Sequence, residues 1–149
     1  MPVHSSARNV LRQRGAGLIE VMVAVLLLAL GLLGIAGMQL ASLQHNHSAA
    51  LRSQAVLLAY DALDRMRANR DAAFVGSYAT AFVDPAPAGA TIEALDLQEW
   101  KGALTALPSG AGAIASAVVG GRTLFTVTVQ WDDSRGELPP QQFSTVSEL

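Results

Sequence analysis

The chain has 149 residues, a formal net charge of -2 and no cysteine. A chain of this length forms one small domain, or a membrane segment followed by a small domain. The weak net charge gives no reason to expect a nucleic-acid partner, and without cysteine there are no disulfides, thiolate metal sites or cysteine nucleophiles.

The first fifteen residues are basic. They contain Arg8, Arg12 and Arg14 and no acidic residue, so the rest of the chain carries seven basic and twelve acidic side chains. A short basic flank before an apolar run predicts that the N-terminus stays in the cytoplasm. The remainder of the chain would then lie across the membrane.

An uninterrupted apolar run follows the basic segment. Val21 to Met38 is 18 residues without a charged or polar side chain, which meets the threshold for a membrane-spanning helix. A buried core helix is disfavoured, because the rest of the chain is too small to surround it. A secretory signal cleaved near Ala36 is an alternative, although its apolar region would exceed the usual length of about 7–15 residues. We therefore expect a membrane-anchored helix.

Glu20 stands at the head of this run. An acidic side chain at mid-membrane costs about 2.5–3.5 kcal/mol, and less near an interface. Glu20 either marks the cytoplasmic edge of the helix, where the helix dipole favours an anion, or pairs with a specific cation. Cleavage after Gly15 would make the amino group of Ala16 such a cation, four residues from Glu20 on the same helix face. The same group on a neighbouring helix could instead set the axial register between chains.

Helical periodicity continues beyond the apolar run. Apolar side chains recur every three or four residues at Leu51, Ala55, Leu58, Ala62 and Met66. Without proline between residues 16 and 69, we expect one long helix with an apolar half, 16–43, and an amphipathic half, 44–70.

The remaining residues, 71–149, predict a small α+β domain. A loop is expected at 84–91, followed by a short helix that begins at Asp96 as its N-cap and ends by Pro108. Trp100, Leu104 and Leu107 would form its apolar face.

The C-terminal third predicts β-structure. Residues 111–131 read as a β-hairpin turning at Gly120-Gly121, and "QQFSTVSEL" as a further short strand. Because 79 residues without disulfides are marginal alone, this sheet should dock on the amphipathic helix face.

Several groupings of polar residues favour structural roles over chemistry. Asp61, Asp64 and Arg65 have the spacing of helix-surface ion pairs. His45 and His47 are two apart, so a helix would point them away from each other and from a shared metal. We expect Arg65, Arg67 and Arg70 to form a solvated helix end, and Asp132, Asp133 and Glu137 an acidic turn without EF-hand spacing. The sequence predicts no enzyme, metal or cofactor.

The segment "RGAGLIEVMVAVLLLALGLLG" resembles the leader and N-terminal helix of type IV pilins and of type II secretion pseudopilins. The resemblance implies that residues 1–15 are a leader, which prepilin peptidase removes after Gly15 before methylating Ala16. Glu20 would be the fifth mature residue, neutralised by another subunit's N-terminus during filament assembly. The family usually has Phe or Met where this chain has Ala16.

Three further segments resemble the PilV family of minor type IV pilins: "AYDALDRMRANRDA", "LQEWKGALTALPSGAG" and "TVTVQWDDSRG". The resemblance implies a pilin fold, a long N-terminal helix on a small antiparallel sheet. It also implies an inner-membrane protein with a periplasmic head that later enters the pilus fibre. The implied partners are prepilin peptidase, other minor and major pilins, the inner-membrane assembly platform and membrane lipid. A minor pseudopilin and an ordinary anchored periplasmic binding domain are the alternatives.

Overall fold

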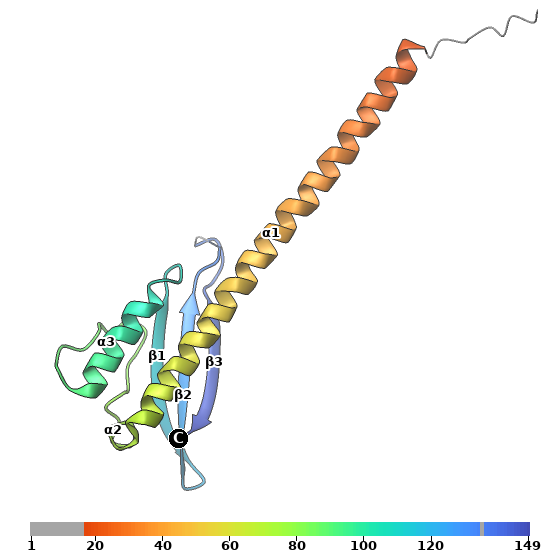
Figure 1. Ribbon diagram of the computed structural model, residues 1–149. Helices are drawn as coiled ribbons and strands as arrows, with labels where there is room; N and C mark the ends of the chain where they lie inside the picture. The colour runs from red at the N-terminus through yellow and green to blue at the C-terminus, as the bar shows by residue number, and fades with distance from the viewer. Residues whose placement is uncertain (1–16, 135) are drawn as a thin grey trace, which may run out of the picture. The chain divides into compact units, whose positions relative to one another are not determined.

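The computed structural model describes residues 17–134 and 136–149, so the predicted leader, with Gly15 and Ala16, lies outside the described residues. The chain divides into two units, one ending at Leu43 and one comprising Gln44–Leu149. The elements, labelled in Figure 1, are α1 (Leu18–Ala68), α2 (Arg70–Phe74), α3 (Ile92–Leu104), β1 (Ala111–Val119), β2 (Arg122–Trp131) and β3 (Gln141–Glu148). The predicted α+β class and pilin-like arrangement are confirmed.

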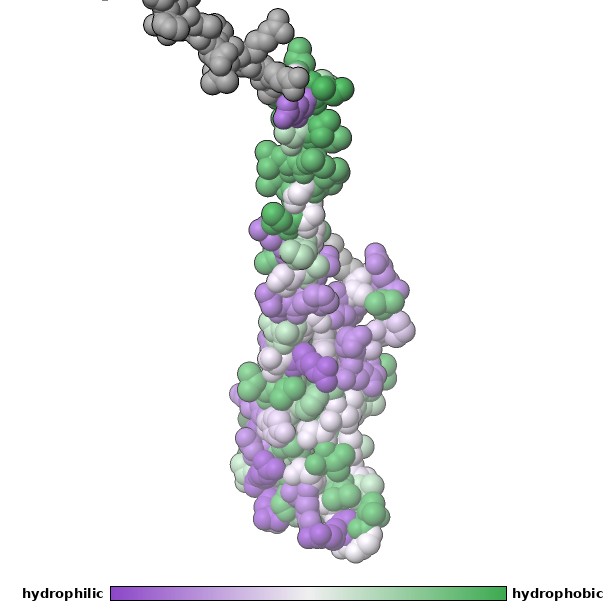
Figure 2. Space-filling view, turned by 90° about the vertical axis from the view of Figure 1, so that its right-hand side faces the viewer, coloured by the Kyte–Doolittle hydropathy of each residue, from purple (hydrophilic) through white to green (hydrophobic). Residues whose placement is uncertain are grey.

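The first unit consists, in its described part, of the apolar beginning of α1. Every side chain from Leu18 to Leu43 is exposed, and hydrophobic colouring dominates its visible surface in Figure 2. By length and composition, α1 is the one helix in the described chain that could cross a membrane. Such a surface is stable only in lipid or against other apolar helices.

The sheet of the second unit is a three-stranded antiparallel meander in the order β1-β2-β3. Gly120 and Gly121 connect β1 to β2 with φ values of 59° and 80°. Two successive positive φ angles are those of a type I′ turn, which favours glycine. The predicted hairpin and the third strand are both confirmed.

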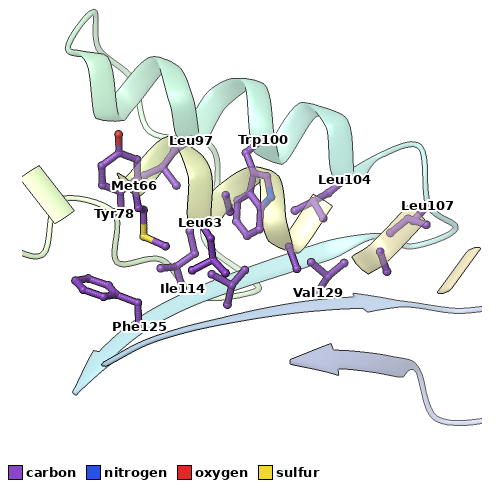
Figure 3. Packing of buried hydrophobic residues seen from close by; sticks show 14 of the residues in the cluster. Leu63, Met66, Tyr78, Leu97, Trp100, Leu104, Leu107, Ile114, Phe125 and Val129 are labelled. Atoms are coloured by element: carbon purple, nitrogen blue, oxygen red, sulfur yellow. The ribbon is translucent and has the colours of Figure 1, made fainter. Parts of the chain in front are cut away.

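The core lies between the sheet and one face of α1, with α3 completing it (Figure 3). Alternate residues of β2 are buried at Phe125, Val127, Val129 and Trp131. The buried residues of α1 are Leu51, Ala55, Ala59, Ala62, Leu63 and Met66. The predicted helix face is therefore confirmed, although Leu58 is only partly buried and Ala59 and Leu63 were missed.

The prediction that the short helix begins at Asp96 was wrong. α3 begins at Ile92, after Thr91, whose backbone is extended with φ -73° and ψ 154°. Asp96 lies inside the helix, four residues after its start, and its carboxylate accepts hydrogen bonds from the hydroxyl of Tyr78 and the guanidinium of Arg65. Sequence reasoning assigned Asp96 a local partner, whereas the fold supplies distant ones.

Trp100 joins α3 to both other layers. Its indole Nε1 donates a hydrogen bond to the carbonyl oxygen of Leu58 at 2.8 Å, while its ring lies against β1. A Cβ added at Gly112 of β1 would lie 2.4 Å from Trp100 Cη2 and 2.7 Å from Leu104 Cδ1. Glycine at this position therefore allows α3 to approach the sheet.

We expect Gly112→Ala to lower the free energy of unfolding by about 1–3 kcal/mol, because the methyl group overpacks the Trp100 contact. Gly102→Ala is the matched control, since a Cβ there meets no atom within 4 Å. As Gly102 lies inside α3, its replacement should instead stabilise by about 0.5–1 kcal/mol. Chemical denaturation of the detergent-solubilised chain measures both changes, and equal effects of the two variants would contradict the packing argument.

Candidate functional site

Glu20 occupies the first turn of α1. The turn is closed by the carbonyl oxygen of Gly17, which accepts hydrogen bonds from the amides of Glu20 at 2.8 Å and Val21 at 3.4 Å. The carboxylate therefore lies where unpaired helix N–H groups create positive potential. It is the only charged side chain between Gly17 and Arg52.

Within residues 17–134 and 136–149, Glu20 forms no ion pair and its side chain is exposed. Its helix presents apolar side chains on every side, so a partner on a neighbouring helix would meet one carboxylate in an otherwise uncharged surface. The other two predicted site residues, Gly15 and Ala16, lie outside the described part of the chain, and the structure does not test them.

Comparison with family models matches residues 11–36 to the prokaryotic N-terminal methylation motif. This is a prepilin-type N-terminus. The matched segment holds Gly15, Ala16 and Glu20 together with the first half of the apolar run. No curated protein and no solved structure matches the chain significantly.

The prepilin-type motif and the fold agree with each other. The motif supports a type IV pilin-like protein that prepilin peptidase processes and the apolar helix anchors in a membrane. A long N-terminal helix and a small antiparallel sheet are the architecture expected for such a protein. The motif also indicates a structural role in an assembly rather than an enzymatic one.

In the second unit, an ion-pair network around Arg65 fixes α3 against α1. Arg65 Nε lies 3.0 Å from Asp61 Oδ2, and Nη1 lies 3.2 Å from Asp96 Oδ1 and 2.8 Å from Glu99 Oε2. Hydrogen bonding to Glu99 is the main cause that raises the pKa of Arg65. The Asp61–Arg65 helix pair was predicted from sequence, but its extension to α3 depends on the fold.

The remaining arginines of the segment also have tertiary partners. Arg67 Nη1 lies 2.8 Å from Asp64 Oδ1, and its Nη2 donates a hydrogen bond to Ser147 Oγ of β3 at 3.0 Å. Arg70 donates a hydrogen bond to the backbone carbonyl of Leu149. Arg67 and Arg70 are exposed, as expected for a solvated helix end, and their hydrogen bonds also tie the end of α1 and α2 to the C-terminal residues.

A groove lies between the part of α1 that begins at Gln44 and the loop after β2. His45, His47, Asp133 and Glu137 are among its lining residues. Asp133 accepts a hydrogen bond from the hydroxyl of Ser48 at 2.8 Å, which joins the two walls. Among the described residues, no group of three histidine or carboxylate side chains is placed to hold a metal ion.

Tyr78 lies at the inner end of the Arg65 network, in a segment that sequence reasoning left without a role. Its hydroxyl donates to Asp96 and accepts a hydrogen bond from Asn69 Nδ2 at 3.3 Å. Burial, with the adjacent Asp96 carboxylate, raises the pKa of Tyr78 to about 12. The folded chain therefore favours the protonated phenol.

This shift predicts alkaline destabilisation. The folded chain keeps the Tyr78 proton to about pH 12, whereas an unfolded tyrosine loses it near pH 10, so this contribution to stability is complete below about pH 10 and falls between about pH 10 and 12. Thermal melting across this range should show a shallower decline for Tyr78→Phe than for the unaltered chain. Parallel profiles would contradict the prediction.

Proposed function

We propose that the chain is a minor type IV pilin of the PilV kind. Prepilin peptidase would cleave after Gly15 and methylate Ala16, and the mature chain would join other pilins. The observation that carries the proposal is the single carboxylate of Glu20 in the first turn of an exposed, membrane-length apolar helix, within a matched N-terminal methylation motif.

In the proposed mechanism, Glu20 gives direction and register to subunit docking. An unpaired carboxylate in or near lipid raises the free energy of the isolated subunit. Pairing with the amino terminus of a neighbouring subunit relieves that cost at only one axial offset between the helices. Apolar packing then supplies non-directional attraction, while the charge pair selects the register.

We assign the remaining parts of the chain to this mechanism as follows. Residues 16–43 form the membrane and filament-core half of the helix, and 44–70 the amphipathic half that supports the head. Residues 71–149 are the periplasmic head. The Arg65 network and the Trp100 contact support this division, because they hold the head on the second half of α1.

The biological role that we propose is initiation of pilus assembly with other minor pilins on the inner-membrane platform, with incorporation in the fibre. Twitching motility would then depend on the chain. A minor pseudopilin of type II secretion has the same N-terminal motif, and its deletion would impair secretion instead. An ordinary anchored binding domain would lack cleavage at Gly15.

The N-terminus of the protein is the first test. Purified from cells that contain prepilin peptidase, the chain should begin at methylated Ala16, and from cells lacking the peptidase it should begin within the leader. Edman sequencing and intact-mass measurement distinguish these species. A start near Gly37 in both strains would support an ordinary secretory signal and overturn the proposal.

Glu20→Ala tests the register mechanism separately from processing. We expect normal membrane insertion and cleavage, but a roughly 5- to 30-fold fall in the amount recovered with sheared fibres or assembled complexes, as follows from losing about 1–2 kcal/mol of docking free energy. Glu20→Asp, which retains the carboxylate, is the matched control and should lose less. Unchanged incorporation of Glu20→Ala would contradict the assigned role.

A further inference from the structure

The sheet has two edges that differ in how they are protected. At the β1 edge, Thr80 and Ile114 exchange two backbone hydrogen bonds of 3.0 and 2.8 Å. Trp100 and Leu104 of α3 lie against Gly112 of the same strand. β3 forms the other edge and pairs only with β2 within the described residues.

The Thr80 bridge identifies the free backbone groups of β3. Ile114 directs its N–H and C=O to Thr80, away from β2. Its cross-strand neighbour Val127 therefore directs its own N–H and C=O away from β1, toward Thr145 of β3. The register is continuous through both ladders, so successive residues alternate. The residues of β3 whose N–H and C=O point away from the sheet are Gln142, Ser144, Val146 and Glu148.

This edge lacks the features that usually prevent strand pairing. Natural edge strands are protected by lysine, proline, bulges or a covering segment. From Gln141 to Ser147 the strand has no charged residue and no proline, and its pairing with β2 shows no bulge. Across residues 17–134 and 136–149, no other segment hydrogen-bonds the free backbone groups of Gln142, Ser144 or Val146.

The core is also incomplete on this side. The Arg67–Ser147 hydrogen bond places one side of α1 beside β3. Tyr60 lies seven residues earlier on that side, about 10 Å along the helix, which is the level of Phe143 and Ser144 on the strand. Tyr60 is 48% exposed and Phe143 is only partly buried. A fourth strand beside β3 would cover both aromatic side chains.

We propose that β3 accepts an extended strand from a different polypeptide, added along Gln142, Ser144 and Val146. Only an extended backbone offers donors and acceptors at the spacing of these free groups. Because Tyr60 and Phe143 are partly exposed beside this edge, the partner strand carries apolar side chains at the alternate positions that pack on them. The proposal goes beyond the proposed function and does not depend on cleavage at Gly15.

A second copy of this chain fits the edge poorly. The free part of β1 offers only Ser116 and Val118, because Ile114 is occupied by Thr80. Antiparallel pairing of two β3 strands would reverse one helix segment Gln44–Ala68, about 36 Å long, against the other. In each copy Gln44 is followed, toward the N-terminus, by the apolar run. The Gln44 residues of the two copies would lie at opposite ends of the pair, so both apolar runs could not enter the same membrane surface. A different subunit has no such restriction.

Site-specific photocrosslinking in the producing cells tests the proposal on the full chain. Benzoylphenylalanine would replace Gln142 or Val146, whose side chains lie at the free edge, and Thr126 at the centre of the same sheet face as control. We expect both edge positions, but not Thr126, to crosslink to one segment of another protein, at sites about four residues apart as strand pairing requires. Peptide mass spectrometry would locate these sites.

Ser144→Pro, combined with each crosslinker, tests the backbone hydrogen bonds. Its missing N–H points away from β2, so the fold should persist while the adducts fall by roughly tenfold. Ser144→Ala should retain them. Ser144→Lys keeps the backbone and adds a charge, so it provides the test if the proline variant fails to fold. Absent or scattered adducts, adducts to a second copy, or adducts unchanged by Pro or Lys would overturn the proposal.

Discussion

The second unit depends on the burial of one face of α1 against β2. Ala55, Ala59 and Ala62 are buried on this face, and Leu63 and Met66 belong to the same hydrophobic core as Val127 and Phe125 of β2. Neither partner is stable alone, since a three-stranded sheet and an amphipathic helix each need an apolar surface to cover. The polar contacts of the unit form only after this burial has brought α1 and the sheet together.

The polar contacts make that arrangement specific. Arg65 reaches α3 only because α1 lies at the correct rotation on the sheet, and Trp100 donates to the helix backbone only where Gly112 leaves room. Exposed ion pairs contribute little stability individually. These ion pairs instead fix the position of α3, so that it covers one side of α1 and leaves the other side open.

That asymmetry gives the unit distinct sides for assembly. The first half of the β1 edge is covered by Thr80 and α3, whereas the whole β3 edge presents free backbone groups beside a partly exposed aromatic surface. In the minor-pilin role proposed above, the chain would need contacts that differ from one neighbour to the next. Glu20 and the apolar helix could be shared with many subunits, while an open strand edge would select a particular one.

The sequence by itself determined the elements whose signals are local. Apolar length identified the first half of α1, the position of Glu20 five residues after Gly15 identified the prepilin-type N-terminus, and the Gly120-Gly121 turn identified the hairpin. The tertiary structure decided the rest. In the folded chain α3 begins at Ile92 and not at Asp96, Tyr78 is buried and hydrogen-bonded to Asp96, and β3 forms an edge of the sheet. These features depend on which segments meet in space, and neither periodicity nor residue spacing encodes such meetings directly.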